Sequence, residues 1–369
     1  MISNFNIEVY KEFNDELEKL WINFEKESNH YYFQTFKWQK YWFKQMRKNK
    51  KNFISMYIIV VKNNNEILFI LPMCINKFFC FKILSWSGFP FSDYNAPLIK
   101  KDFTIKNEDF LIVWKLILKK NKKSFNGVNL VNQPKTINHI LNPFFQFLKS
   151  SLSMSYFGIF FEENHNKNKS LILDLKYQTN RLKKVGDLVF NIAKCKKEKK
   201  IVLKFILENK RAQYKKTDGW DLFEINAYKL FFIECHINLY SNLHLSYLTL
   251  NDNIIAAHSG YIYNNHYYYL FPAYDFNFKK YSPGKILLNY LIVNCKEKKI
   301  SYFDFTIGAE EYKKKWSNHE INSCHTLRSV NMIGFFYVTF IKFKIILRNM
   351  NFKNKLLSKI KNKINTNVK

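Results

Sequence analysis

Residues 245–316 constrain the possible fold of this chain more than any other segment. The segment opens with three stretches rich in β-branched and aromatic residues, at 245–250, 254–263 and 266–273. Short runs of Asn and Asp separate these stretches, and both residue types tolerate the positive φ that tight hairpin turns require. The three stretches are therefore predicted to form an antiparallel meander.

The periodicity changes after the meander. Apolar residues recur at three-to-four spacing after Ser282-Pro283-Gly284, which predicts a helix with Ser282 as its N-cap and Pro283 in its first turn. A fourth strand is predicted at 301–305. Because a crossover helix separates it from the meander, this strand is expected to lie beside an earlier one.

The start of the predicted helix has the properties of an anion-binding site. A helix N-terminus presents free backbone N–H groups and the positive end of the helix dipole. Gly284 would let a ligand approach the backbone closely, and Lys285 would add a positive charge. An ordinary capped helix is the structural alternative, and these residues alone leave it open.

Three motifs in this segment resemble a known family. They are YSPGK at 281–285, FDFTIG at 303–308, and EYK at 311–313 followed by Trp316. In this order and spacing they resemble the tandem-GNAT family named for cellulose and exopolysaccharide biosynthesis (CelD type), which is similar to the FemAB peptidyl transferases. Ala309 departs from the pattern, because the family usually carries an acidic residue there.

The resemblance implies an α/β fold of two GNAT-like domains, with mixed, mostly antiparallel sheets flanked by helices. The expected division is a degenerate N-terminal domain at 1–174, an acyltransferase domain at 175–330, and a basic amphipathic helix and tail at 331–369. The implied reaction transfers an acetyl or longer acyl group from acyl-CoA. The implied acceptor is an amine or hydroxyl of a sugar, lipid precursor or polysaccharide, and no metal is implied.

The resemblance also suggests which residues bind the donor. Ser282, Gly284 and Lys285 are assigned to acyl-CoA, at the predicted helix start. Arg211 is a further candidate, because the family carries a basic motif at this place. It lies in the segment 176–216, which holds 14 Lys or Arg against three acidic residues.

Asp304, Tyr312 and Lys313 are assigned to the chemistry and are expected beyond the end of the last strand. Either Asp304 acts as a base or Tyr312 acts as an acid. The structural alternative for Asp304 is a strand-end carboxylate paired with Lys313.

Asp93, Tyr94 and Glu310 are assigned to the acceptor, with Asp93 and Tyr94 at the rim of its pocket. Asp93 can equally be a turn-forming residue. Glu310 or its neighbour Glu311 would supply the acid that Ala309 lacks, or else the site is altered.

The remaining segments are predicted from periodicity. Helices are expected at 36–46, 109–120, 137–148, 201–214 and 227–241. Strands are expected at 53–61, 67–74, 81–86, 127–132, 156–161, 171–175, 221–224 and 325–330.

The charge of the chain favours anionic partners. The 369 residues include 59 Lys and Arg against 29 Asp and Glu, a formal net charge of +30. Richness in Lys, Asn, Ile, Phe and Tyr together is what an AT-rich genome encodes, and this explains part of the surplus. Nucleic acid is not favoured, because no coiled-coil insertion of the kind that FemAB-type enzymes carry is recognised.

Six scattered cysteines without a Cys-x-x-Cys pair favour a reducing cytoplasm over a zinc site or a disulfide framework. The polar, acidic N-terminus does not read as a secretory signal. No apolar run reaches the ~18 residues of a spanning helix.

The C-terminal segment 331–369 carries nine Lys or Arg and no acidic residue. Its Phe336, Phe340, Phe343 and Leu347 share one helical face. It is either a capping helix with a solvated tail or a peripheral anchor on the anionic inner face of a membrane.

Two other functions remain open: a catalytically silent binding protein of a polysaccharide-biosynthesis machinery, which Ala309 favours, and an aminoacyl-tRNA-dependent transferase of FemAB type.

Overall fold

The computed structural model describes residues 5–48, 53–162, 169–217, 219–238 and 241–347 of the chain. Its largest element is a mixed sheet of 11 strands to which both halves of the chain contribute. Along the sheet the strands are β13 (Leu188–Ile192), β14 (Leu243–Leu250), β15 (Asn253–Tyr263), β16 (His266–Tyr274), β17 (Tyr302–Ile307), β12 (Ser151–Phe160), β18 (His319–Ser329), β9 (Gly127–Pro134), β7 (Phe81–Trp86), β6 (Met73–Phe78) and β3 (Phe53–Met56).

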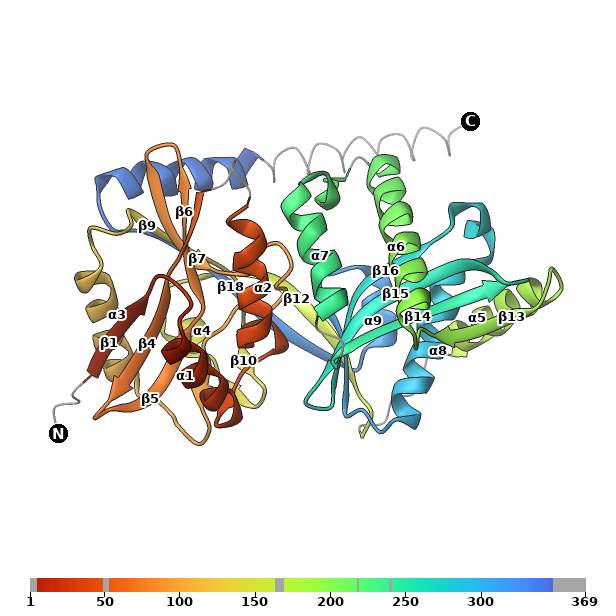
Figure 1. Cartoon of the computed structure of the whole chain (residues 1–369), viewed down its shortest axis with the longest axis horizontal. Coiled ribbons are helices and arrows are strands. Elements are labelled where there is room, and N and C mark those ends of the chain that lie inside the picture. The colour runs from red at the N-terminus through yellow and green to blue at the C-terminus, as the bar shows by residue number, and fades with distance from the viewer. Residues whose placement is uncertain (1–4, 49–52, 163–168, 218, 239–240, 348–369) are drawn as a thin grey trace, which may run out of the picture.

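A second sheet of five strands lies in the N-terminal half (Figure 1). Its order is β1 (Phe5–Tyr10), β4 (Ile58–Asn63), β5 (Glu66–Leu71), β8 (Leu98–Lys100) and β2 (Ser28–Asn29). A two-stranded ribbon is formed by β10 (Thr136–Ile137) and β11 (Ile140–Leu141).

The predicted meander is confirmed. Strands β14, β15 and β16 pair antiparallel in sequence order. Their turns use Asn251 and Asp252, then Asn264 and Asn265, all four with positive φ. Helix α8 (Pro283–Glu297) follows and crosses over to β17, which pairs parallel to β16 as a crossover connection requires.

The ladder between β16 and β17 is short, and its end positions the candidate site. It has three pairs, of which the last joins Tyr268 to Asp304, although both strands continue. Just beyond it, Thr306 has a φ of 58° and gives its backbone N–H to the Asp304 carboxylate, at 2.6 Å. The two strands therefore separate beyond Asp304.

Strands β12 and β18 join the two halves. Strand β12 lies between β17 and β18, and β18 then pairs with β9 of the N-terminal half. The core is also shared, since Tyr32 stacks on Tyr261 with ring centroids 4.7 Å apart. The predicted boundary at Asp174 falls inside helix α5 (Lys169–Lys183), and the division into domains stays a prediction.

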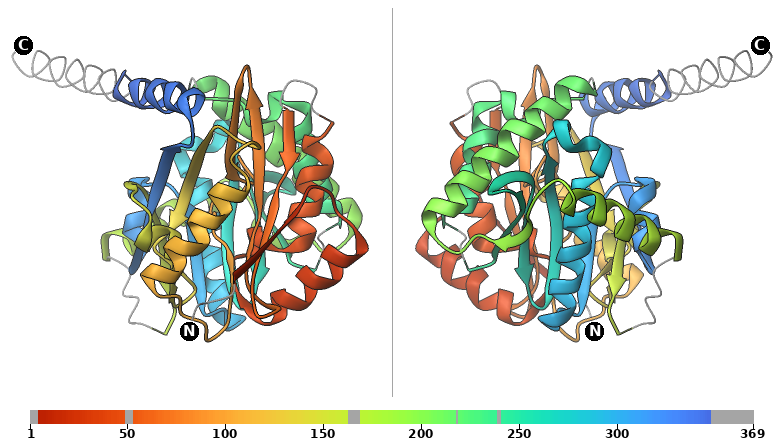
Figure 2. Two further views of the ribbon diagram at one scale, coloured as in Figure 1. Left: turned by 90° about the vertical axis from the view of Figure 1, so that its left-hand side faces the viewer. Right: turned by 90° about the vertical axis from the view of Figure 1, so that its right-hand side faces the viewer.

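Helices cover both faces of the C-terminal part of the sheet (Figure 2). Helices α6 (Lys196–Lys216) and α7 (Asn226–Asn238) share a hydrophobic cluster with Ala257 and Tyr268. Helices α5 and α8 share another with the neighbouring residues Ala256 and Tyr267. Because successive strand residues point to opposite faces, the two pairs of helices lie on opposite sides.

The other helices are α1 (Asp15–Lys26), α2 (Phe36–Met46), α3 (Asn107–Lys120), α4 (Pro143–Phe147) and α9 (Glu311–Trp316), with short 3-10 turns η1 (Tyr32–Gln34), η2 (Leu222–Glu224) and η3 (Phe276–Tyr281). A last helix covers residues 332–347. The predicted tail beyond residue 347 lies outside the described residues.

Three predicted elements are wrong. The strand expected at 171–175 is part of α5, whose Leu171, Leu175 and Leu182 are buried at helical spacing. The strand expected at 221–224 is the turn η2, because the Asp221 side chain accepts the N–H of Phe223. The helix expected at 137–148 is the ribbon β10–β11 followed by the short α4.

Two predicted strands, 53–61 and 67–74, are each divided between the two sheets. The first becomes β3 and β4, and the second becomes β5 and β6. Pro72 lies at the second division and lacks the N–H of a ladder residue. At the first division, Tyr57 gives its N–H to the carbonyl of Met73, at 3.0 Å.

We expect Glu25→Gln to change how stability depends on pH. The Glu25 carboxylate accepts the N–H of Phe36 at 2.5 Å, and burial raises the pKa of Glu25 from 4.5 to about 7. The folded state thus holds the Glu25 proton more tightly than the unfolded state does. The protonated carboxyl therefore contributes folding stability that is present below pH 4.5 and is lost as pH rises through 7. Glutamine keeps an acceptor without the charge.

Urea unfolding at pH 5 and pH 8 measures this. From pH 5 to pH 8, the free energy of unfolding of Glu25→Gln should rise relative to that of wild type by on the order of 1–3 kcal/mol. The exposed Glu27→Gln is the matched control. If the variant and wild type differ in unfolding free energy by the same amount at pH 5 and pH 8, the raised pKa of Glu25 is not the cause.

Candidate functional site

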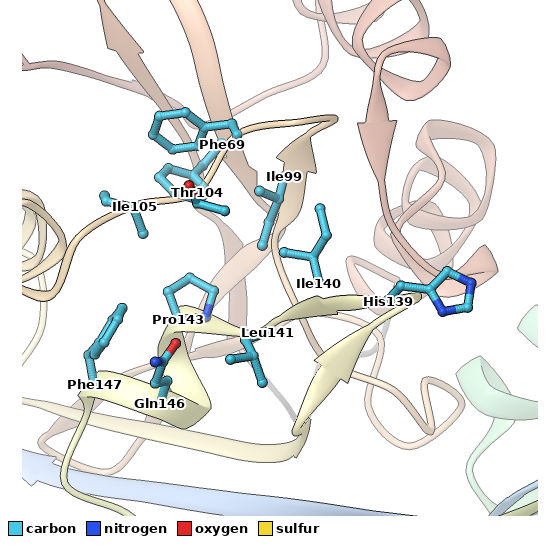
Figure 3. Close-up of a pocket in the computed structure, with 11 residues that line it drawn as sticks. Phe69, Ile99, Thr104, Ile105, His139, Ile140, Leu141, Pro143, Gln146 and Phe147 are labelled. Atoms are coloured by element: carbon cyan, nitrogen blue, oxygen red, sulfur yellow. The ribbon is translucent and has the colours of Figure 1, made fainter.

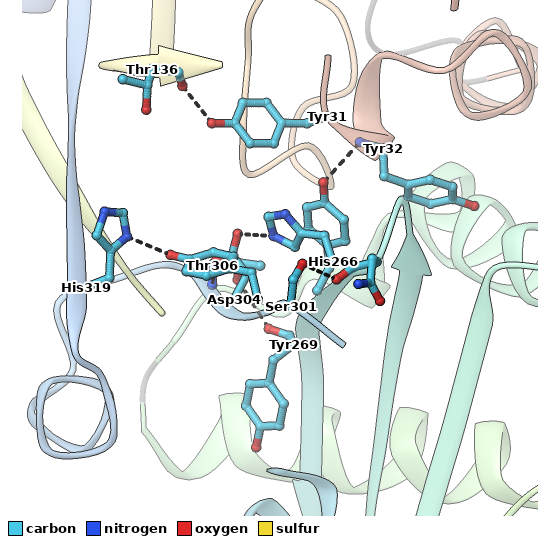
Figure 4. Close-up of polar contacts among 12 residues, drawn as sticks. Tyr31, Tyr32, Thr136, His266, Tyr269, Ser301, Asp304, Thr306 and His319 are labelled. Atoms are coloured by element: carbon cyan, nitrogen blue, oxygen red, sulfur yellow. Dashed lines mark hydrogen bonds and ion pairs between the residues drawn. The ribbon is translucent and has the colours of Figure 1, made fainter. Parts of the chain in front are cut away.

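The centre of the candidate site is a buried His–Asp pair. The Nε2 of His266 and the Oδ2 of Asp304 are 2.9 Å apart, and the other carboxylate oxygen accepts the N–H of Thr306 (Figure 4). Asp304 has an exposed fraction of 0%. The parallel register brings the pair together, because Tyr268, two residues after His266, is opposite Asp304.

His266 has the surroundings of a proton acceptor. Its ring stacks on Tyr268 at 4.1 Å, and its side chain keeps 16% exposure. With Nε2–H donated to Asp304, a neutral imidazole presents Nδ1 as an acceptor. The sequence analysis missed His266. His266 could have been found from its position at the start of β16, because the crossover helix α8 makes β16 parallel to β17, the strand that carries Asp304.

His266 and Asp304 line a cavity of ≈ 670 Å³ between the two halves. The N-terminal half contributes Tyr31, Tyr94 and His30, among others. Two further His–Tyr contacts lie in the wall: His30 Nε2 to the hydroxyl of Tyr263 at 2.7 Å, and His319 Nδ1 to that of Tyr302 at 3.2 Å. Burial lowers the pKa of His30 to about 4. The wall thus combines aromatic rings with many polar side chains, including histidines, asparagines, tyrosine hydroxyls and Asp304.

Tyr94, assigned to the acceptor from the sequence, does line this cavity. Its ring lies between those of Tyr31 and Tyr156, with centroid distances of 4.3 and 4.1 Å. Burial raises the pKa of Tyr94, and the nearby Asp304 charge raises it further. This stack packs the loop of the N-terminal half against β12, to which Tyr156 belongs.

Asp93 lies close to the same end of β17. Burial raises the pKa of Asp93 to about 6, although the hydroxyl of Thr306 and the charge of Lys313 act in the opposite direction. The Asp304 charge adds to the rise. The structure therefore brings Asp93 and Asp304 together, as two carboxyl groups whose surroundings differ.

Lys313 is buried and has two oxygen partners. Its Nζ donates to the carbonyl of Ile307 at 2.6 Å and lies 3.0 Å from the carboxylate of Glu310. Asp304 instead pairs with His266 and Thr306, so the structure does not have the Asp304–Lys313 pair considered from the sequence. Glu310 takes the position beside Lys313.

Helix α6 brings one more lysine to this region. Burial lowers the pKa of Lys210 to about 8, the Lys313 charge lowers it too, and Glu310 raises it. Tyr312 is 37% exposed, with its ring edge-on to Phe305 at 6.4 Å. Lys313, one of the residues of α9 assigned to the chemistry, thus lies near Lys210 of α6.

The start of α8 leaves Gly284 accessible. A Cβ at Gly284 would have one described neighbour within 4 Å, the Cδ1 of Tyr274 at 3.5 Å. Gly284 is the second residue of the helix, where a backbone N–H has no intrahelical partner. Ser282 is the N-cap, as predicted, and has a φ of 52°, although its side chain makes no capping hydrogen bond.

Two other residues assigned to the donor have protein partners. Lys285 Nζ lies 2.5 Å from the carboxylate of Asp174 on α5. Arg211 Nε lies 2.9 Å from the carboxylate of Asp221, a side chain that is 6% exposed. Beyond Arg211, the end of α6 reaches the segment before α8, where Lys216 Nζ lies 3.9 Å from the ring centre of Phe276.

These contacts separate the roles of Arg211 and its neighbour Lys210. Arg211→Ala would leave the Asp221 carboxylate without its guanidinium, so we expect the free energy of unfolding to fall by about 1–2 kcal/mol with CoA binding retained. Lys210→Ala should weaken ligand binding with a smaller loss of stability. Calorimetric titration and thermal unfolding measure both effects.

Lys204→Ala is the matched control, because Lys204 is an exposed lysine of the same helix. A fall in CoA affinity for Arg211→Ala without any loss of stability would restore Arg211 to the donor site.

A smaller cavity, of ≈ 380 Å³, lies within the N-terminal half (Figure 3). Its walls are mainly apolar, with Phe69, Ile99 and Phe147 among them. None of the residues assigned to the site lines this cavity. It therefore has no part in the candidate site.

The described residues contain neither a metal site nor a membrane-spanning helix. In the described ranges, no group of three or more His, Cys, Asp or Glu is placed to hold a metal ion. All six cysteines are free thiols. None of the described helices is both long and apolar enough to cross a bilayer.

Part of the chain is similar to a known family model. Residues 169–314 match the model of an acetyltransferase (GNAT) domain. A search of curated proteins finds no match. The sequence motifs at 281–285, 303–308 and 311–313 all lie within the matched range.

Solved structures of similar fold cover most of the chain. FemX aligns with a TM-score of 0.53 and 10% identity, over 85% of this chain and 96% of that one. A conserved protein of unknown function from Bacteroides thetaiotaomicron VPI-5482 aligns with a TM-score of 0.52 and 11% identity, over 88% and 100%. Identities this low establish the fold alone. The predicted α/β fold is confirmed, and the resemblance to the CelD type stays a prediction.

Proposed function

We propose that this chain, which carries a GNAT acetyltransferase domain at 169–314, transfers an acyl group from acyl-CoA to an amine or hydroxyl. The acceptor would be a sugar, lipid precursor or polysaccharide. The observation that carries the proposal is the His266–Asp304 pair at the end of the β16–β17 ladder, facing a cavity.

The donor would be held at the start of α8. Its pyrophosphate would accept a hydrogen bond from the N–H of Gly284 and lie at the positive end of the helix dipole, because the N–H groups of Lys285 and Ile286 already donate to the carbonyl of Ser282. Lys216 at the end of α6 is exposed and lies beside Phe276, shortly before α8, so it would add positive charge. Lys285 would contribute less, since its ammonium pairs with Asp174.

The acceptor would bind in the cavity between the halves. Aromatic rings beside many hydrogen-bonding side chains suit an organic acceptor that carries several polar groups, such as a sugar, and those side chains would orient its nucleophile. Tyr31 and Tyr94 would form one wall, and His266 would lie beside the acceptor. Tyr94 would thus act as predicted from the sequence, whereas Asp93 is not among the residues that line this cavity.

The chemistry would be direct attack of the acceptor nitrogen or oxygen on the thioester carbonyl carbon. A C–N or C–O bond forms, the C–S bond breaks, and the CoA sulfur leaves as a thiolate. His266 Nδ1 would take the proton of the acceptor, while Asp304 holds the opposite ring nitrogen and stabilises the imidazolium. Tyr312 would return a proton to the thiolate, and Lys313 would hold Glu310 and the end of β17 in place.

Free thiol release tests the proposal directly. Purified protein is mixed with several acyl-CoA thioesters and candidate aminosugar acceptors, and thiol is followed with a chromogenic reagent. Acceptor-dependent release supports acyl transfer. Thermal stabilisation by CoA with no release from any pair would favour the silent binding protein, for which Ala309 remains the motivating feature.

A further inference from the structure

The helix at 332–347 is fixed to the body of the protein on one side. Gly334 lies so close to the N-terminal half that a Cβ there would be 1.8 Å from the carbonyl oxygen of Asn126. Tyr337 accepts a hydrogen bond from Asn129 at 3.0 Å, and Val338 is buried. Residues 334, 337 and 338 share one side of a helix, so the orientation of the opposite side is set.

That opposite side is apolar and exposed. Phe336, Phe340, Phe343 and Leu347 recur at three-to-four spacing, with exposed fractions of 62%, 56%, 58% and 44%. Exposed apolar surface on this scale marks an interaction site rather than ordinary surface. The lysines of this helix, Lys342 and Lys344, are exposed too, and residues 332–347 contain no acidic residue.

A separate element presents the same chemistry at the same end of the molecule. The hairpin of β6 and β7 rises beside the helix in Figures 1 and 2. The ring of Phe81 on β7 packs against that of Tyr337 on the helix, with ring centroids 5.6 Å apart. At its tip, Phe78 is 58% exposed and Phe79 is 88% exposed. Lys77 and Lys82 flank this tip and are exposed as well.

The upper ends of α2, α6 and α7 reach the same level in Figures 1 and 2. The C-terminal end of α6 carries Lys215 and Lys216, both exposed. Trp220, 55% exposed, lies in the connection from α6 to α7. Arg47 and Lys48, at the end of α2, are exposed too.

A groove of ≈ 920 Å³ lies on the body-facing side of the helix, where Val338 is buried, and is lined by Lys149, Arg328, Lys342, Ile345 and Ile346 among others. The exposed end of the molecule is separate from this groove. On that end, exposed basic and apolar side chains occur together on the helix, the hairpin tip and the ends of α2 and α6. We name this end the aromatic–basic face: helix 332–347, the tip at 77–82, and the ends of α2 and α6 with Trp220.

We propose that the aromatic–basic face docks on the surface of an anionic lipid bilayer. Exposed Phe and Trp side chains insert at the boundary between headgroups and acyl chains, while lysines and arginines pair with anionic headgroups. A protein partner would need a matching acidic and apolar surface, whereas a bilayer offers both over any area. The described part of this helix, residues 332–347, carries two lysines, so we place it in the interface rather than across the bilayer.

Vesicle sedimentation with the full chain tests this. Phosphatidylcholine vesicles and vesicles of phosphatidylcholine with phosphatidylglycerol are compared at low and high salt. Wild type should sediment with the anionic vesicles, and high salt should reduce this binding. Phe78→Ser with Phe79→Ser, and separately Phe336→Ser with Phe340→Ser, should each lower the bound fraction severalfold with unchanged melting temperature.

Leu173→Ser is the matched control, since Leu173 is 67% exposed on α5, outside this face. Binding unchanged in both double variants would overturn the proposal. Removal of residues 351–369 separates the tail from the face. If this removal alone abolishes binding and the double variants bind as wild type does, the tail acts without the face.

A second copy of the chain is the competing occupant. Analytical ultracentrifugation in the absence of lipid distinguishes it. A wild-type dimer that Phe336→Ser with Phe340→Ser converts to a monomer would overturn the membrane proposal. A monomeric wild type that binds anionic vesicles supports it. Neither result depends on acyl transfer, so this proposal and the proposed function can fail separately.

Discussion

Gly284→Val is expected to abolish CoA binding and leave the protein folded. A side chain at residue 284 would begin in ordinary contact with Tyr274, 3.5 Å away, so the free protein has room for it. Valine is also no worse than glycine as a helix residue. The same side chain would crowd the N–H of Gly284, which a pyrophosphate would bind at this helix start. We expect the affinity for CoA to fall by about 100-fold or more, which corresponds to about 3 kcal/mol.

Lys285→Ala is the matched comparison at the adjacent position. The backbone N–H groups and the helix dipole remain, and the lost ammonium was paired with Asp174. Its effect on CoA affinity should therefore be much smaller than that of Gly284→Val. Calorimetric titration of CoA into both variants shows which one loses more affinity. Thermal unfolding shows whether both remain folded. Wild-type affinity in Gly284→Val would exclude the start of α8 as the donor site.

His266→Ala and Asp304→Asn are expected to lower kcat by about 10²–10⁴-fold with CoA affinity unchanged. His266 would lose the proton acceptor itself. Asparagine at residue 304 has one acceptor oxygen for two donors, the imidazole N–H and the N–H of Thr306. Either His266 turns to its other tautomer or one donor is left without an acceptor.

The double variant makes this test sharper. If His266 and Asp304 act as one unit, the double variant should be about as slow as His266→Ala alone. Independent roles would instead multiply the two losses. His139→Ala is the control, because His139 lines the same cavity and is exposed. A wild-type kcat in His266→Ala would remove His266 from the mechanism.

The sequence predicted well the elements that local signals specify. Turns of Asn and Asp at 251–253 and 264–265 defined the meander, and Ser282-Pro283-Gly284 marked the start of α8. Periodicity alone placed α2 at the observed bounds, Phe36–Met46. These signals lie within a few residues of the elements that they specify.

The partners of charged side chains could not be predicted in this way. His266 and Asp304 are 38 residues apart, and the register of two parallel strands brings them together. Arg211 was assigned to the donor from its basic surroundings, whereas its partner Asp221 becomes visible only when α6 and η2 are packed. The division of 53–61 between two sheets likewise depends on strand pairing, because β3 pairs with β6 whereas β4 pairs with β1 and β5.

The exchange of strands between the halves has a consequence for how substrate reaches the cavity. Many two-part enzymes close by swinging one part about a flexible hinge. Here β12 and β18 continue one hydrogen-bonded ladder across the junction, so such a swing would have to bend a paired sheet. The width of the cavity is therefore a nearly constant property of the molecule. Selection among acceptors would then follow from size and shape at an aperture that is already formed, with side-chain rotations as the main adjustment.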